Sequence, residues 1–189
     1  TGIVTARKSN GFFMQTPDAS IDADAQTSEG IFVFTSVAPV AAVGDAVGVV
    51  GTATEFFNLT QIDASLPGDV SVITSGNPLP APVTLTPAIL DPAGTPTQLE
   101  RFEGMRMFAP SLTSVAPTSG FGETSTVLTG VPRPMREPGI QVSDPVPVDP
   151  TSGLIDCCIP RFDENPERIV VDTDGLIGTT PLTVTSNVI

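Results

Sequence analysis

The side chains best suited to binding a metal ion lie in one acidic segment near the start of the chain. Residues 18–29 include Asp18, Asp22, Asp24 and Glu29. Calcium takes several oxygen ligands from a flexible loop, so these four carboxylates are candidate calcium ligands. The segment lacks the glycine and the final glutamate that mark an EF-hand loop. The alternative interpretation, which this mismatch favours, is a solvated loop kept soluble by its charge.

A second candidate site combines basic and aromatic side chains on the first predicted hairpin. Its members are Arg7, Lys8, Phe12, Phe13 and Gln15. On barrels of the oligonucleotide-binding (OB) type, such side chains stack on bases and hold phosphates. Neighbouring side chains of a strand point to opposite faces, so only one of the two phenylalanines can belong to the core. The alternative is that the other ring is covered by the proline-rich segment or by a neighbouring domain.

Three further clusters have simpler interpretations. The adjacent Cys157 and Cys158 follow an aspartate in a chain without histidine, which disfavours a thiolate, so packing of small residues is expected. Residues 172–175, Asp-Thr-Asp-Gly, are typical of a turn after a strand. Glu103 lies close in sequence to two arginines, and such a carboxylate more often forms a structural ion pair than a catalytic group.

Composition excludes several classes of protein. The chain has 189 residues, no His, Trp or Tyr, and 8 Lys+Arg against 21 Asp+Glu, which gives a net charge of −13. Without histidine there is no Ser-His-Asp or Cys-His machinery and no His-ligated zinc. The negative charge opposes phosphate binding by the surface as a whole. At 40% hydrophobic residues the chain can still bury a core. Composition therefore argues against a self-sufficient enzyme and against a general nucleic-acid binder.

The elements that position the candidate residues are predicted to be strands, because hydrophobic residues recur with a period of two. In the first part of the chain, strands are expected at 2–7, 12–16, 30–35, 46–56, 59–62 and 70–74. Asn10-Gly11 predicts a hairpin between the first two. Gly48 and Gly51 mark a bend in the long fourth strand, as a sheet that curls into a barrel requires. We therefore expect an all-β protein in which residues 1–75 form a small OB-like β-barrel.

Prolines separate this barrel from the rest of the chain. Residues 76–104 are predicted to form a proline-rich strap with edge pairing around 83–85 and a short helix at 98–103. Residues 105–189 are predicted to form a second small β module, truncated at its C-terminus and with very little helix. Its strands are expected at 105–108, 112–116, 126–128, 140–142, 168–171 and 182–185.

Several segments, taken in order, resemble a known family. They are 2–6, 11–15, 22–34, 43–45, 55–62 and 102–105. Together they resemble the region that precedes the catalytic domain in large secreted bacterial nucleases of the endonuclease/exonuclease/phosphatase superfamily. The resemblance implies an OB-like barrel in an extracellular parent enzyme that hydrolyses phosphodiesters with a divalent metal. It also implies a catalytic domain downstream of Ile189. That catalytic core depends on histidine, so no catalytic residue carries over to this chain.

The sequence thus predicts a non-catalytic accessory region of a secreted nuclease. It would place single-stranded or double-stranded nucleic acid, or scaffold the catalytic domain of the same chain. The alternative is a structural or adhesion module of a secreted protein that binds no nucleic acid. A self-contained metal-dependent hydrolase using the acidic loop is disfavoured. No apolar run approaches the length of a membrane-spanning helix.

Overall fold

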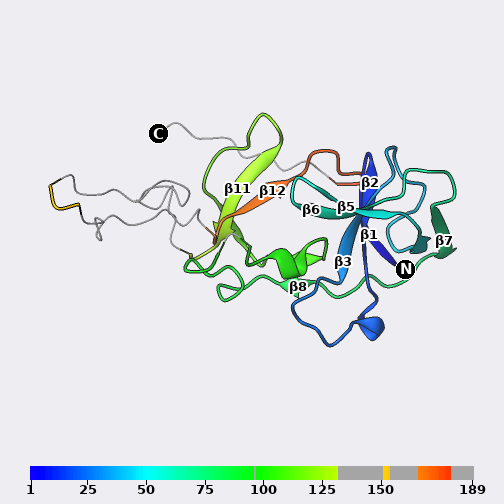
Figure 1. Ribbon diagram of the computed structural model, residues 1–189, viewed down its shortest axis with the longest axis horizontal. Coiled ribbons are helices and arrows are strands. Elements are labelled where there is room, and N and C mark those ends of the chain that lie inside the picture. Colours follow the sequence, from blue (N-terminus) through cyan, green and yellow to red (C-terminus); the bar gives the residue numbers. More distant parts are fainter. Residues whose placement is uncertain (96, 132–150, 154–165, 180–189) are drawn as a thin grey trace.

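The computed structural model describes residues 1–95, 97–131, 151–153 and 166–179, and its elements are strands and two short 3₁₀ helices. Figure 1 shows two β regions side by side along the longest axis, with β11 and β12 beside the sheet that contains β1–β7. The predicted all-β class is confirmed. The predicted strands at 140–142 and 182–185, and the adjacent cysteines, lie outside the described residues.

The chain begins with an antiparallel meander of β1 (Gly2–Lys8), β2 (Gly11–Gln15) and β3 (Gly30–Phe34). The predicted hairpin is confirmed, but its two loop residues are Ser9 and Asn10, because Lys8 pairs with Gly11. Gly11 is required in the strand instead, where a Cβ atom would lie 2.3 Å from the Val33 carbonyl oxygen. A bulge in β1 between Val4 and Ala6 increases its twist.

The long predicted strand is divided in two by Val50 and Gly51. Its halves are β4 (Ala46–Val49), which pairs with β1, and β5 (Thr52–Phe56), which pairs with β6 (Leu59–Asp63). With β7 (Val70–Thr74), the strand order is β5-β6-β3-β2-β1-β4-β7, and β3 and β6 are parallel. Because β4 and β5 are consecutive in the chain but far apart in this order, the sheet must curl. The ladders between described strands form no closed ring, so a closed barrel stays a prediction.

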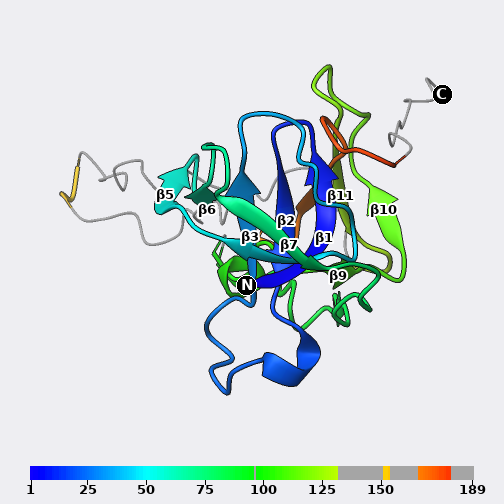
Figure 2. The same cartoon turned by 90° about the vertical axis from the view of Figure 1, so that its right-hand side faces the viewer.

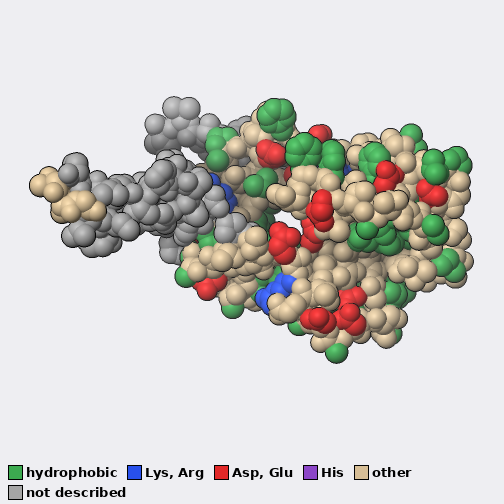
Figure 3. Space-filling view, in the orientation of Figure 1, with side chains coloured by type: hydrophobic (Ala, Val, Ile, Leu, Met, Phe, Trp, Pro, Cys, Tyr) green, Lys and Arg blue, Asp and Glu red, His purple; other side chains and the backbone are tan. Residues whose placement is uncertain are grey.

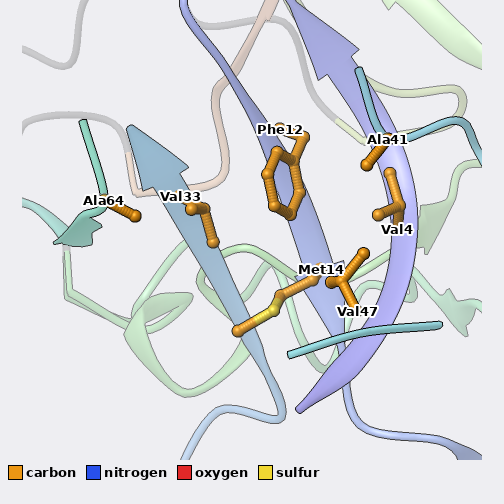
Figure 4. Close-up of a cluster of buried hydrophobic side chains, with 7 residues drawn as sticks. All are labelled: Val4, Phe12, Met14, Val33, Ala41, Val47 and Ala64. Carbon is orange, nitrogen blue, oxygen red and sulfur yellow. The ribbon is translucent and has the colours of Figure 1, made fainter. Parts of the chain in front are cut away.

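The main hydrophobic cluster of this sheet lies on one of its two faces. Phe12 and Met14 alternate along β2 and point the same way, and Phe12 is fully buried. They pack with five smaller side chains, seen in Figure 4: Val4, Val33, Ala41, Val47 and Ala64. Burial of these apolar side chains holds the curled sheet together. The opposite face is left to carry other side chains, Phe13 among them.

The second region is built on two small sheets. β8 (Val83–Thr84) pairs in parallel with β9 (Met107–Phe108), and β10 (Leu112–Ser114), β11 (Glu123–Leu128) and β12 (Ile169–Asp172) form an antiparallel sheet. The expected edge pairing around 83–85 is confirmed. Leu85 and Leu90 of the proline-rich segment are buried against Leu128. The segment predicted as a strap therefore forms part of the second core.

Short 3₁₀ helices, η1 (Asp18–Ser20) and η2 (Glu100–Phe102), complete the described elements. The helical turn expected at 98–103 is thus present in a shorter form.

After η2, the side-chain amide oxygen of Gln15 accepts the backbone N–H of Arg106 at 2.9 Å. Glu103 does not form the expected ion pair with Arg101 or Arg106 in the described part of the chain. Its Oε1 instead accepts the backbone N–H of Thr60 at 3.2 Å, which ties the segment to β6.

The turn after β12 docks on the first hairpin. Ser9 donates its backbone N–H to the Gly175 carbonyl at 2.9 Å, and Ile177 donates to the Arg7 carbonyl at 2.9 Å. Lys8 Nζ lies 3.5 Å from Asp172 Oδ2. Residues 172–175 form the predicted turn, and the structure adds that this turn joins the second region to β1.

Candidate ligand-binding site

Strand alternation gathers aromatic rings on the face of the first sheet opposite the core. Phe13 pairs with Phe32 across β2 and β3, and their ring centroids are 4.9 Å apart with the planes tilted by 55°. The parallel pairing of β3 with β6 then sets Gln61 beside Phe32. Because Phe12, Val33 and Ile62 occupy the intervening positions, they point to the core while the aromatic set points away from it.

The hairpin between β5 and β6 adds a further wall. Phe56 pairs with Leu59, and the two loop residues Phe57 and Asn58 have φ of 50° and 62°. Asparagine tolerates this left-handed conformation, but a bulky aromatic residue adopts it at a cost of about 1–2 kcal/mol. Phe56 and Phe57 contact each other edge to face, with ring centroids 4.7 Å apart. A strained turn that presents exposed rings is a feature often found at functional sites.

These side chains line a pocket of about 440 Å³, which lies within the range of small-molecule sites. Four phenylalanines and a leucine supply its apolar wall: Phe13, Phe32, Phe34, Phe56 and Leu59. Polar groups are few, namely Lys8, Asn10, Gln61 and Asp63. A concave, mostly aromatic surface with a few polar groups is the usual character of a ligand site.

Gln61 is the polar side chain of the pocket that is least exposed. Only 8% of its surface is accessible, yet its carboxamide makes no hydrogen bond within the described residues. The buried side-chain polar atoms without a partner in the described residues belong to arginines, so the Gln61 amide atoms themselves remain accessible. The amide faces a pocket, where a ligand or water can satisfy it.

The predicted nucleic-acid residues are not brought together on one face. Phe12 lies in the core, and Gln15 is 1% exposed with its amide oxygen bonded to the second region. The Arg7 guanidinium donates to the Pro39 carbonyl. Lys8 and Phe13 do line the pocket, although Lys8 is paired with an aspartate. The expectation that only one of the two phenylalanines is core is confirmed, and it is Phe13 that remains outside.

The predicted calcium ligands are used as backbone acceptors instead of converging. Asp18 accepts the Ala81 N–H at 3.0 Å, which pins the loop to the proline-rich segment. The other three accept N–H groups within their own loop: Asp22 from Asp24, Asp24 from Gln26, and Glu29 from Asp22. Figure 2 shows the loop that contains η1 projecting away from the sheet. Among the described residues, no group of three or more acidic or cysteine side chains is placed to hold a metal ion.

The sequence did not single out Phe32, Phe34, Phe56 or Gln61. Phe32 and Phe34 alternate with a valine, so the sequence pattern was sufficient to predict that one face of this strand is aromatic. The position of Gln61 beside Phe32 could not be predicted from the sequence, because it depends on the parallel pairing of β3 with β6. Parallel neighbours are not adjacent in sequence, so their register is set by tertiary structure.

Apolar side chains are also exposed at the end of the first sheet that carries β7. Val37, Val40, Leu66 and Val72 line one hollow of about 340 Å³ beside β7, while Ile73, the next residue of β7, is exposed on the opposite face of the strand. Figure 3 shows hydrophobic side chains exposed at this end of the molecule, among acidic and other side chains. β7 is an edge strand among the described ladders, so its outer backbone groups are available to another chain or domain.

No protein-family model matches this chain, and no curated protein or solved structure is found to be similar to it. None of the helices in the described ranges has the length and apolar character needed to cross a membrane.

Proposed function

We propose that this chain is an accessory β region of a secreted phosphodiesterase and scaffolds a catalytic domain of the same polypeptide. The resemblance to secreted nucleases supports the class of parent enzyme. The apolar end beside β7 supports the scaffolding role, and it is the observation that carries the proposal. Val40 is 98% exposed and Leu66 is 70% exposed, and both line the hollow beside β7. Exposed apolar side chains that cluster next to a free strand edge favour contact with another folded protein surface.

Four basic side chains of the described residues argue for scaffolding over the holding of nucleic acid by its phosphates. Arg7 and Arg106 donate to the carbonyls of Pro39 and Pro80, and Lys8 pairs with Asp172. Arg101 lies over the Phe102 ring, 4.7 Å from its centroid. Each of these cations has an intrachain partner, and the net charge is −13. Phosphate binding would need free, clustered cations.

The coding sequence that flanks this chain tests the parent enzyme. A neighbouring domain with histidine and paired acidic metal ligands, as that superfamily requires, would support the proposal. Flanking sequence without such a domain would overturn the nuclease assignment. It would favour the alternative, a structural or adhesion module, since the same apolar end serves another protein partner.

Charge substitutions test the scaffold. In the protein joined to its flanking domain, Val40→Glu and Leu66→Glu should lower the melting temperature of that domain, because each puts a carboxylate into the proposed contact. Phe121→Glu is the matched control, since Phe121 is 80% exposed in the second region. Equal effects of all three substitutions would argue against a contact at the β7 end.

A further inference from the structure

We propose that the aromatic pocket on the outer face of β2, β3, β5 and β6 binds an uncharged, flat nitrogen heterocycle of the adenine type. Phe13, Phe34 and Phe56 would contact its faces, and the Gln61 carboxamide would read its edge. This inference goes beyond the scaffold role, because it requires neither a catalytic domain nor contact at the β7 end.

The pocket walls favour a flat ring. Phe32 is 4% exposed and forms the floor, whereas Phe13 and Phe34 are partly exposed and Phe56 is 58% exposed. Rings at different tilts around one cavity offer both faces and edges to a planar guest. Stacking of bases on aromatic side chains is a general mode of nucleobase binding that needs no cation.

The Gln61 amide selects the edge of that ring. A carboxamide presents one acceptor and one donor side by side, and adenine presents a ring nitrogen acceptor beside an exocyclic amine donor. Glutamine pairs with adenine in this bidentate way in protein–DNA complexes. Gln61 is more than nine-tenths buried, lines the pocket and has no partner in the described part of the chain. A heterocycle of this type would satisfy both of its hydrogen-bonding groups.

The charged groups of the pocket disfavour a phosphate. Lys8 is already paired with Asp172, and Asp63 accepts the Ser65 N–H at 3.2 Å while keeping its negative charge in the lining. Figure 3 shows further acidic side chains around the opening between the two β regions. A nucleoside should therefore bind more tightly than its phosphorylated form. The base can come from two sources, a free nucleoside or an unpaired base of a single strand.

A titration followed by NMR of the Gln61 side-chain NH₂ group tests the proposal. The probes are adenosine, adenosine monophosphate, and short oligodeoxyadenylate and oligothymidylate strands, each at low and high salt. Gln61→Met removes the amide and keeps the side-chain length, and it assigns the NH₂ signal by its loss. Gln26→Met, in the exposed acidic loop, is the matched control. Phe56→Leu removes an exposed wall, with Phe121→Leu as its control.

We expect adenosine to shift the Gln61 signal and to bind more tightly than its monophosphate, with the gap narrowing at high salt. Gln61→Met should weaken adenosine binding about tenfold or more, and Gln26→Met should not change it. The melting temperature of Gln61→Met should stay close to that of the wild type, because the Gln61 amide has no hydrogen bond within the described residues to lose. Phe56→Leu should weaken binding several-fold without unfolding the protein.

Binding of the adenine strand in preference to the thymine strand, lost in Gln61→Met, would place the base in single-stranded nucleic acid. Binding of adenosine alone would indicate a free nucleoside. The proposal is overturned if neither adenosine nor the adenine strand shifts the Gln61 signal, or if Gln61→Met binds adenosine as tightly as the wild type does. It is also overturned if affinity falls steeply with salt, which is the signature of phosphate-led binding. None of these outcomes depends on the flanking coding sequence, so they are separate from the test of the scaffold.

Discussion

At the scale of single residues, Asp45 shows how one carboxylate fixes a loop. The Ala42 backbone N–H donates to its Oδ2 at 2.8 Å. This bond, together with a second from the Ser75 hydroxyl, holds the pKa of Asp45 below its ordinary value of 3.8, although burial opposes the shift. The Asp45 carbonyl also accepts the Val4 N–H, so the loop is anchored to β1 from two sides.

This lowered pKa predicts a loss of stability in acid. Because the folded state favours the ionised carboxylate, its contribution is fully present above the unfolded pKa, near 3.8, and is lost as pH falls through the lower folded pKa. Asp45→Asn should be less stable than the wild type at neutral pH, and the difference in melting temperature should narrow below about pH 4. Melting curves of both proteins over this range test it. A constant difference would mean that the charge of Asp45 makes no contribution.

Phe57 is the residue whose conformation conflicts most with its type. Its φ of 50° is unfavourable for an aromatic residue, and its side chain is 90% exposed and buries little area. Phe57→Asn should therefore raise the free energy of unfolding by about 1 kcal/mol, measured by urea denaturation. Phe121→Asn, at an exposed phenylalanine with ordinary φ, should change it by less than about 0.5 kcal/mol. A loss of stability in Phe57→Asn would show that the edge-to-face contact with Phe56 outweighs the strain.

At the scale of elements, the division between β4 and β5 decides the shape of the first sheet. Gly51 lies against β6, where a Cβ atom would be 2.2 Å from the Asp63 carbonyl oxygen. The close approach lets one stretch of chain pair with β1 and then with β6. Glycine is needed here for space, whereas the sequence pattern predicts a bend at Gly48 and Gly51 from the curl of a barrel and not from this close approach.

Gly51→Ala should therefore lower the free energy of unfolding by about 1–3 kcal/mol, since the backbone must shift to make room. Urea denaturation provides the measurement. Gly120→Ala is the control, because a Cβ atom there would meet nothing within 4 Å. If the two substitutions have the same effect, the approach of Gly51 to β6 is not what shapes the sheet.

At the scale of the whole molecule, the two β regions are joined by backbone contacts more than by charge. A Cβ atom on Gly30 would lie 2.3 Å from the Gly104 carbonyl carbon, so the backbone segments at Gly30 and Gly104 cross in direct contact. Glu103, between η2 and this crossing, accepts from Thr60 and from the Ser28 hydroxyl. The ion pair of Lys8 with Asp172 is partly exposed, and such pairs contribute 0–1 kcal/mol at most sites.

Gly30→Ala should accordingly destabilise the protein by about 1–3 kcal/mol and speed hydrogen exchange at the Arg106 amide, which bonds to Gln15 across the junction. Asp172→Asn should change stability by less than about 1 kcal/mol. Hydrogen exchange of both variants, followed by NMR, makes the comparison. Faster exchange in Asp172→Asn than in Gly30→Ala would reverse this order of importance.

Most of the described strands, and the alternation of side chains along each of them, could be predicted from the sequence. Alternation along β1–β3 and the bend at Gly51 are local properties, because a strand's side-chain period and a glycine's small size need no partner to be read. Composition also excluded histidine chemistry. The placement of Phe12 and Phe13 on opposite faces of β2 follows from the same alternation, but the sequence does not show which of the two rings is buried.

The candidate site could not be predicted from the sequence. Gln61 reaches Phe32 because β3 and β6 pair in parallel, and the engagement of Arg7, Arg106 and Asp18 depends on segments distant in the sequence. A local sequence pattern does not predict such pairings, because the contacts that fix them form between residues widely separated along the chain. The acidic loop and the basic hairpin have the residue types of binding sites, but Asp18, Lys8 and Gln15 bond to segments later in the chain, and most of the other groups bond or pack within the first region.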